Sequence, residues 1–184
     1  TTTRGISRTV LAEFIKRRMI YEDRKYHNAV FVGYDKSGVA RHAHKHGTFT
    51  GGKAFKGNEE SSDPKYSFHW TGKSGRLYVF EAPIDLLSFL TLYQKEWEQH
   101  SYVALCGLSE QGLFQMLEDV PYIRQVALCL DRDRAGLQAE ERIKKNLEGR
   151  GYREVFPLFP SGKDWNEDLQ ELMAKGRREN LQMQ

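Results

Sequence analysis

The chain has 184 residues, of which 39% are hydrophobic and 29% are charged, so we expect one globular domain of ordinary size, or one domain plus a small appendage. No apolar run approaches the roughly 20 residues that a membrane span requires, and no secretory signal opens the chain, which argues against a membrane partner. Its two cysteines, Cys106 and Cys129, are too few for a disulfide framework and are expected in the core. We therefore expect a cytoplasmic protein.

The charge is unevenly distributed along the chain. Residues 1–76 contain 15 lysines and arginines against 7 acidic residues, a net charge of +8, whereas residues 77–184 contain 13 against 18, a net charge of −5. The two parts together give the overall charge of +3. A phosphate-contacting surface beside a cation-binding one would produce this asymmetry, and chance variation between solvated faces would produce it equally well.

Residues 1–76 are predicted to form a small α+β part. Apolar residues recur at helical spacing after Ser7, a typical N-cap, and β-rich runs on both sides of a glycine-containing turn indicate a hairpin. The expected elements are a helix over residues 6–20, strands over 28–33 and 39–46, a loop over 47–65 and a short strand over 66–70.

From residue 77 the pattern changes to apolar runs that alternate with helical periodicity. Strands that are apolar throughout and alternate with helices indicate a parallel sheet with helices on both faces. We therefore predict an α/β fold, with a parallel four-stranded sheet and flanking helices over residues 77–175, and a C-terminal tail, residues 176–184, that frays. The strands are expected at 77–80, 102–106, 126–130 and 153–158, and the helices at 85–97, 109–117, 134–147 and 164–175.

Acidic residues stand where two of these strands end. Glu81 follows the first strand, and Asp131 and Asp133 follow the third. Ligands of open α/β sheets bind beyond the carboxyl ends of the strands, and carboxylates at such a place need a compensating partner, which Mg²⁺ provides. Taken alone, the Asp131/Asp133 pair is a weak signal, and the N-cap of the following helix is the favoured role of Asp133. Three acids at two strand ends of one sheet favour the metal site.

Three motifs carry a resemblance to the Toprim family. VFEAPIDLLS (79–88) is similar to the first Toprim motif, CLDRDRAG (129–136) to the DxDxAG signature, and FPSGKDWNEDL (159–169) to the KDxN segment of primase-type Toprims. The motifs occur in the order of the family and span most of residues 77–170. The resemblance implies a Toprim-like, that is Rossmann-like, domain.

The chain resembles in particular the Toprim-like proteins of plasmids and conjugative elements, in which an accessory domain of unknown function precedes the Toprim part. The segment GISRTVLAEFIKRRMIYEDRKYHNAVFVGYDKSG (5–38) is similar to that accessory domain. The resemblance implies an accessory domain over residues 1–76 and a Toprim domain over 77–175. Because such proteins commonly carry a zinc-finger module upstream, we expect the chain to be a piece of a longer protein.

The resemblance also assigns roles to individual residues. Glu81 matches the glutamate of the family, a general acid/base or metal ligand, and Asp131 and Asp133 match the metal pair, which implies Mg²⁺ or alternatively Mn²⁺ as the cofactor. The supporting or phosphate-contacting residues would be Asp85 after the first motif, Arg132 and Arg134 between the acids, and Lys163 and Asp164 of the KD pair.

Two other groups of residues have both a functional and a structural interpretation. His42, His44 and His46 share one face of a strand and could hold Zn²⁺, but an exposed basic strand is favoured because no acid or cysteine is nearby in the sequence. Cations then alternate with aromatic residues, as in a surface that binds single strands, although packing of the rings is slightly favoured. The cations are Lys53, Lys56, Lys65, Lys73 and Arg76, and the rings are Phe55, Tyr66, Phe68 and Trp70.

As a whole, the sequence predicts a Mg²⁺-dependent, primase-like protein that acts on nucleic-acid phosphodiesters during replication or transfer of a mobile element. The expected partners are DNA in single-stranded form and a helicase, relaxase or other mobile-element protein. Two alternatives stay open: a metal-dependent nuclease, and a Toprim module that binds DNA or a partner without chemistry. The same metal site would serve polymerisation and cleavage, so the residues do not separate the two.

Overall fold

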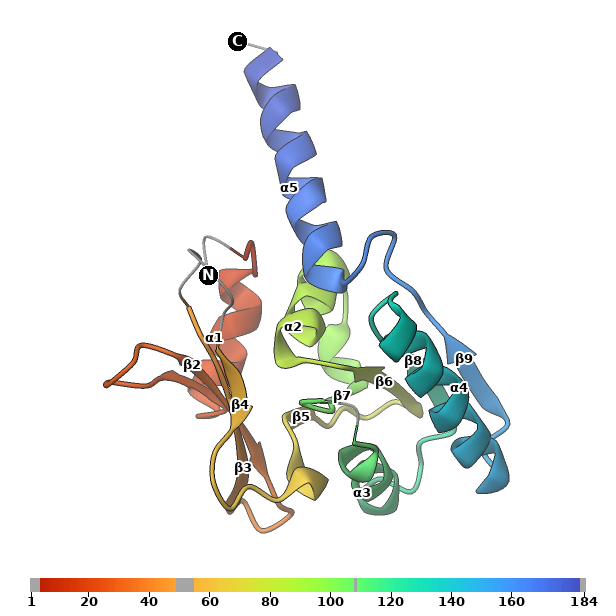
Figure 1. Cartoon of the computed structure of the whole chain (residues 1–184). Helices are drawn as coiled ribbons and strands as arrows, with labels where there is room; N and C mark the ends of the chain where they lie inside the picture. Colours follow the sequence, from red (N-terminus) through yellow and green to blue (C-terminus); the bar gives the residue numbers. More distant parts are fainter. Residues whose placement is uncertain (1–3, 49–54, 108, 183–184) are drawn as a thin grey trace.

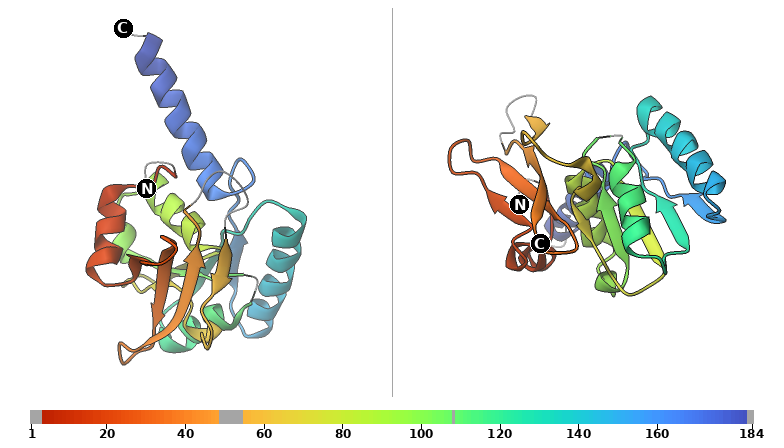
Figure 2. Two further views of the ribbon diagram at one scale, coloured as in Figure 1. Left: turned by 60° about the vertical axis from the view of Figure 1, so that its left-hand side comes forward. Right: turned by 90° about the horizontal axis from the view of Figure 1, so that it is seen from below.

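The computed structural model describes residues 4–48, 55–107 and 109–182, in which two β-sheets lie side by side with helices around them (Figures 1 and 2). The helices are α1 (Arg8–Lys16), α2 (Pro83–Leu92), α3 (Gln111–Asp119), α4 (Arg134–Gly149) and α5 (Trp165–Gln182), with two short 3₁₀ turns, η1 (Pro64–Tyr66) and η2 (Trp97–Gln99).

The first sheet is antiparallel and belongs to the N-terminal part of the chain. Its strands follow one another in the order β1 (Ile20–Glu22), β2 (Ala29–Tyr34), β3 (Ala40–His46) and β4 (Lys56–Asn58). β2 and β3 form the predicted hairpin. The predicted helix over residues 6–20 is too long, because the backbone of Arg18 turns to a positive φ of 60° and the chain enters β1. The predicted loop likewise contains β4, which pairs with β3.

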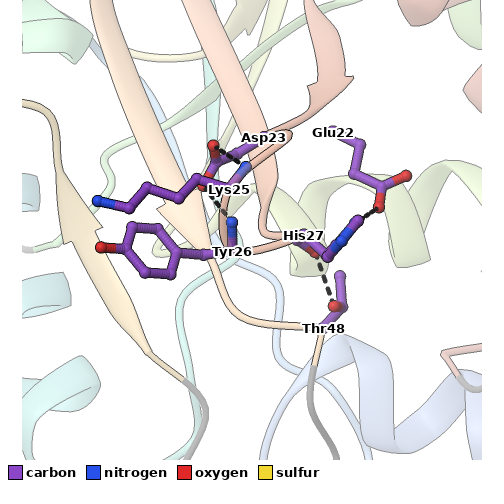
Figure 3. A network of polar contacts seen from close by, with 6 residues as sticks. All are labelled: Glu22, Asp23, Lys25, Tyr26, His27 and Thr48. Carbon is purple, nitrogen blue, oxygen red and sulfur yellow. Dashed lines mark hydrogen bonds and ion pairs between the residues drawn. The ribbon is translucent and has the colours of Figure 1, made fainter.

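A network of polar contacts closes the connection between β1 and β2 (Figure 3). The carboxylate of Asp23 accepts hydrogen bonds from the backbone N–H groups of Lys25 and Tyr26, at 3.1 and 3.3 Å. The hydroxyl of Thr48, beyond the end of β3, donates to the carbonyl oxygen of His27 at 2.8 Å. These bonds tie the turn to the chain after β3 and satisfy backbone groups that no strand pairs.

The second sheet is mixed, with five strands in the order β5–β7–β6–β8–β9. Four of them are parallel, as predicted, but a fifth strand pairs antiparallel with β7 at the edge and corrects the prediction of a four-stranded sheet. That strand is part of the segment 66–70, which we had placed in the N-terminal part. The five strands are β5 (His69–Trp70), β6 (Arg76–Phe80), β7 (Ser101–Ala104), β8 (Gln125–Leu128) and β9 (Glu154–Pro157).

Helices cover both faces of the second sheet, as its apolar strands predicted. Side chains of α2 and α5 pack on one face together with α1 and the first sheet, and those of α3 and α4 pack on the other face. Alternate residues of each strand serve the two sides: in β8, for example, Val126 and Leu128 face α3 and α4, and Ala127 faces α2. Cys129 is buried on the face of the sheet that α2 covers, and Cys106 is partly buried against the same cluster. Both positions are as expected of core residues.

Aromatic residues join the two sheets into one core. Phe68 lies edge-on to Phe31 of β2 and 5.2 Å from the ring of Phe14 in α1, measured between ring centroids. The chain before Phe68 crosses β2 so closely that a Cβ atom at Gly33 would lie 1.6 Å from the carbonyl oxygen of Tyr66. Only glycine permits this crossing, so the first sheet is fixed against the chain that leads into the second.

Helix α5 continues to Gln182 and thus includes most of the tail that we expected to fray. Its first turns pack on α2, whereas the remainder projects away from the body of the molecule (Figure 1). None of the helices in the described ranges combines the length and the apolar character that a membrane crossing requires.

Candidate metal and phosphate site

The predicted acidic residues meet at one edge of the second sheet. β6 and β8 are parallel neighbours, with Val79 opposite Leu128, so their carboxyl ends lie at the same edge. Glu81 follows β6 directly and Asp131 follows β8. The two carboxylates are close enough to interact, because the negative charge of Glu81 raises the pKa of Asp131. The ends of these two parallel strands therefore place Glu81 and Asp131 at the same edge of the sheet.

Asp131 is the most perturbed acid of the DxD motif. One of its carboxylate oxygens, Oδ1, is buried and has no hydrogen-bond partner among the described residues. Burial, followed by the charges of Glu81, Asp164 and Asp133, raises the pKa of Asp131 from 3.8 to about 7. A buried acceptor without a donor is rare and destabilising, so a proton or a bound cation would stabilise this oxygen.

Two further carboxyl groups share this electrostatic environment. Burial, and then the charge of Asp133, raises the pKa of Glu81. The positive charges of Lys56 and Lys163 lower it in part. Asp85, on α2, is 7% exposed, and burial together with the charges of Asp131 and Asp164 raises its pKa to about 8. At pH 7 Asp85 therefore carries a proton for most of the time and acts as a neutral neighbour of the site.

Asp133 has the helix-capping role that the sequence left open. Its Oδ1 accepts hydrogen bonds from the backbone N–H groups of Ala135 and Gly136, both at 3.0 Å, at the start of α4. Its Oδ2 lies 3.8 Å from the ammonium nitrogen Nζ of Lys163. A cap that uses one carboxylate oxygen leaves the other available, so the capping and the ligand interpretations do not exclude each other.

Gly136 of the DxDxAG motif has a steric role. A Cβ atom at this position would lie 2.1 Å from the backbone oxygen of Asp131, far closer than non-bonded atoms approach. The absence of a side chain therefore lets the first turn of α4 pack directly against the loop that carries the acids.

The KD segment is fastened to that loop. The N–H of Arg132 donates to the backbone oxygen of Lys163 at 2.7 Å, and the indole N–H of Trp165 donates to the backbone oxygen of Cys129 at 3.0 Å. Trp165 is 2% exposed and stands edge-on to Phe89 of α2, so it anchors the segment by packing. Lys163 is thereby held next to the acids.

Two residues of this segment escaped the sequence analysis. The carboxylate of Asp168 accepts hydrogen bonds from the N–H groups of Ser161 and Gly162, both at 2.7 Å, and Glu167 accepts one from that of Lys163. The available signal was an acidic pair in the first turn of a helix that follows a Ser-Gly turn. These bonds fix the backbone of the loop that carries Lys163.

The donor set suits a hard divalent cation. In the described part of the chain no three His, Cys, Asp or Glu side chains are arranged as a ready set of ligands for one ion. Mg²⁺, however, usually takes one or two carboxylates and completes its shell with waters and phosphate oxygens. Asp131, with its unpartnered oxygen, fits that demand, as does Oδ2 of Asp133, which takes no part in the helix cap and pairs only at 3.8 Å with Lys163, and Glu81 stands beside them.

A pocket of about 200 Å³ connects the acids with the first sheet. Its lining includes Glu81 and Cys106 from the second sheet and His44, Lys56 and Asn58 from the first. Lys56 is exposed at the start of β4, which the pairing of β4 with β3 carries to this edge. The sequence analysis named Lys56 as a nucleic-acid contact but had no signal that it would lie opposite Glu81, because β4 was expected to be a loop.

The other predicted cations do not gather around the acids. Arg76 begins β6 and donates to the side chain of Gln125, and the backbone N–H of Lys73 bonds near the start of β7, so both lie at the opposite edge of the sheet. Lys65 belongs to η1 and lines a different pocket, and Lys53 lies outside the described residues. The four cations that the structure describes therefore do not form one surface.

The remaining residues that the sequence analysis named are the aromatic rings and the two arginines next to the acids, Arg132 and Arg134. Phe68 and Trp70 are 0% and 5% exposed, so the packing interpretation is confirmed for them. Arg132 is exposed and donates to the backbone oxygen of Ser161 at 3.4 Å, and Arg134 is exposed on the first turn of α4.

The three histidines of β3 are buried, which corrects the prediction of an exposed basic strand. Their exposed fractions are 3% for His42, 5% for His44 and 4% for His46, because their face of β3 is shared with Phe31 and packs on the core. Burial lowers the pKa of all three, that of His42 to about 4. Neither ring nitrogen of His42 has a hydrogen-bond partner among the described residues. Burial thus disfavours the charged form of each of the three rings.

Comparison with protein families divides the chain between β5 and β6, the first two strands of the second sheet along the chain. Residues 1–74 match a family described as a protein of unknown function, DUF3991, and residues 78–169 match the family described as Toprim-like. An uncharacterized protein of Bacillus anthracis, pXO2-78, is 28% identical over 203 residues, which cover 95% of this chain and 58% of that protein. The uncharacterized MG010 homolog of Mycoplasma pneumoniae is 29% identical over 102 residues, covering 55% of this chain and 46% of its own. The chain thus spans about half of the length of these curated relatives.

Solved structures with the same fold are catalytic parts of primases. The primase fragment of the bacteriophage T7 primase-helicase protein superposes with a TM-score of 0.68 at 20% identity, covering 95% of this chain and 71% of that one. The DnaG primase catalytic domain bound to ssDNA has a TM-score of 0.61 at 17% identity, covering 99% and 69%. Identities this low establish the fold alone. With the family match over residues 78–169, which is half of the chain, they show that this chain belongs to the Toprim-like family.

Proposed function

We propose that this chain performs Mg²⁺-dependent chemistry on nucleic-acid phosphodiesters, in the manner of a primase. The observation that carries the proposal is the acidic site at the sheet edge, where Asp131 has a buried oxygen without a partner and a pKa of about 7. Its fold supports the assignment, since one structure of that fold is a primase catalytic domain bound to ssDNA.

Each residue of the site has a distinct role in this proposal. Bound Mg²⁺, or Mn²⁺ in its place, would neutralise charge on a phosphate oxygen and on the leaving or attacking group. Asp131 and the Oδ2 atom of Asp133, the oxygen that does not cap α4, would hold the ion. Glu81, whose pKa is raised, would hold or release a proton at the reacting hydroxyl, since general acid–base catalysis works best near the operating pH.

Cations on both sides of the acids would position the phosphates. Lys163 stands 3.8 Å from Asp133, held by the backbone bond between its carbonyl and Arg132. Lys56 reaches the same acids from the first sheet, which gives the N-terminal part a function in binding substrate. Arg132 and Arg134 would meet a neighbouring phosphate, and Asp85 and Asp164 would support the loop and the acids.

The wider assignment follows from the relatives. The designation pXO2 in the name of the Bacillus anthracis relative is that of a plasmid, which supports a role in replication or transfer of a mobile element. We assign residues 1–76 to an accessory domain and 77–175 to a Toprim domain of a cytoplasmic protein. Single-stranded DNA would be its substrate, and a helicase or relaxase its partner.

A metal-dependent nuclease is the second candidate, because the same acids and cations would serve bond cleavage. The decisive experiment incubates the protein with single-stranded DNA, nucleoside triphosphates and Mg²⁺, and reads primer synthesis and strand cleavage on the same gel. The Asp131→Asn variant should lose whichever activity is found. The matched control is Glu141→Gln, which removes an exposed acid from α4 away from the site and should keep the activity. Absence of both activities together with retained DNA binding would favour a binding module without chemistry.

A further inference from the structure

Three arginines line one pocket on the side of the second sheet away from the acids. The pocket has a volume of about 380 Å³ and is formed by Arg124, Arg150, Arg153 and their neighbours Gly151, Tyr152 and Glu154. It lies where β8 and β9 begin, with Gln125 of β8 paired to Glu154 of β9. Because the acidic site lies at the carboxyl ends of these parallel strands, the two places are at opposite edges of the sheet (Figure 1).

Two of the three guanidinium groups are held in place by the fold. That of Arg150, the residue that ends α4, lies over the ring of Phe114 in α3, 3.8 Å from its centroid. That of Arg124 donates to the backbone oxygen of Ile123 at 2.9 Å and also to that of Pro121. A guanidinium has five N–H donors, so these contacts fix the groups while leaving donors unused.

The remaining charged residues of the pocket are Arg153 and Glu154. Arg153 makes no hydrogen bond or ion pair with any described residue. Glu154 is the one acidic residue among the described residues of the lining, and its carboxylate accepts a hydrogen bond of 2.5 Å from the amide of Gln125. Three positive charges and one negative charge therefore belong to residues that line this pocket, a net charge of +2. Like charges held together disfavour the empty state and favour an anion between them.

We propose that this pocket binds phosphate, either the phosphates of a nucleotide or a phosphate of a nucleic-acid backbone. The planar fork of arginine matches phosphate oxygens two at a time, which favours phosphate over a small spherical anion. A volume of about 380 Å³ is within the range of pockets that hold small ligands. The proposal is independent of the chemistry at the acidic site, because the two sites share no residue.

The test compares binding by the native protein and by the double variant Arg124→Gln, Arg153→Gln, in buffer with EDTA so that no divalent cation contributes. Arg150 is left intact because its stacking on Phe114 stabilises α4 and α3. The matched control is Arg177→Gln, an exposed arginine on α5. Two probes are titrated separately: ATP, by calorimetry, and a fluorescent thymidine oligonucleotide, by anisotropy. Circular dichroism and the thermal midpoint verify that each variant is folded.

The double variant should bind one of the probes about tenfold more weakly, which is about 1.4 kcal/mol, while the control changes affinity by less than about twofold. Loss with ATP identifies a nucleotide site, and loss with the oligonucleotide alone identifies a backbone contact. Equal affinities of the double variant and the control for both probes would overturn the proposal. Absence of measurable binding of either probe to the native protein at millimolar concentration would overturn it as well.

Discussion

Replacing Asp131 by Asn should stabilise the metal-free protein at high pH while removing its response to Mg²⁺. The pKa of Asp131 is raised from 3.8 to about 7 in the folded protein, so the folded state binds the proton more tightly than the unfolded state. The carboxylate therefore costs stability as the pH rises through this interval, and the full cost is present only above pH 7. Asn has nearly the same shape and no charge, so it avoids that cost.

The magnitude follows from the pKa. One pKa unit corresponds to about 1.4 kcal/mol, so the rise from 3.8 to about 7 corresponds to about 4 kcal/mol at most. Asp131 is partly open to water, which screens its charge, so we expect a gain of about 1–2 kcal/mol. For a chain of this size, 1 kcal/mol shifts the thermal midpoint by about 2–4 °C, which predicts a rise of about 2–8 °C at pH 8.5 and almost none at pH 4.

The assay is thermal unfolding at both pH values, with and without 10 mM Mg²⁺. A ligand present at about ten times its dissociation constant stabilises the native state by about 1.4 kcal/mol, so the native protein should gain a few degrees with Mg²⁺ at pH 8.5 and the variant should not. Glu141→Gln serves as the control and should respond to Mg²⁺ like the native protein. A lower midpoint for Asp131→Asn at pH 8.5, combined with an intact response to Mg²⁺, would refute the reasoning.

Three other predictions follow from the same structure. Burial lowers the pKa of His42 to about 4, so the protein should lose up to about 3 kcal/mol of stability as the pH falls from 6.5 through 4, and a His42→Leu variant should show a shallower loss in urea titrations over that range. Gly136→Ala places a Cβ atom 2.1 Å from a backbone oxygen and should lower the free energy of unfolding by about 1–3 kcal/mol. Gly149→Ala, at the open end of the same helix, should leave that free energy unchanged or raise it by up to about 1 kcal/mol. The reverse order in chemical denaturation would contradict the packing described. Affinity for single-stranded DNA should fall steeply with salt, and Lys56→Gln and Lys163→Gln should each reduce the slope of log K against log salt by about 0.7, while an unchanged slope in both variants would place the DNA elsewhere.

The sequence predicted the second sheet well because its strands are uniformly apolar and its motifs stand at strand ends. Glu81 and Asp131 are far apart in the sequence, yet the order of parallel strands alone brings them to one edge. The N-terminal part was predicted less well, because short strands such as β4 carry little periodicity. Lys56 and Gly57 of that strand are polar or small, and only its pairing with β3 defines it.

The histidines show why a residue type can mislead. Alternating histidines suggest a polar face, but the face of β3 that they occupy is decided by its neighbour Phe31 and by the chain that crosses Gly33. Those contacts come from residues distant in the sequence. The fifth strand, β5, was assigned to the wrong sheet for the same reason. Trp70 would be buried in either sheet, and only its pairing with Tyr102 of β7 shows that β5 belongs to the second one.

The projecting helix α5 has a mechanical consequence. Its first residue, Trp165, is bonded to the backbone at the end of β8, and the residue two positions earlier is bonded to the loop between the two aspartates. Beyond its first turns the described part of the helix projects away from the body of the molecule (Figure 1). We therefore expect a displacement of the first turn of α5 to move the loop that carries Asp131 and Asp133, because these two hydrogen bonds join the helix start to that loop.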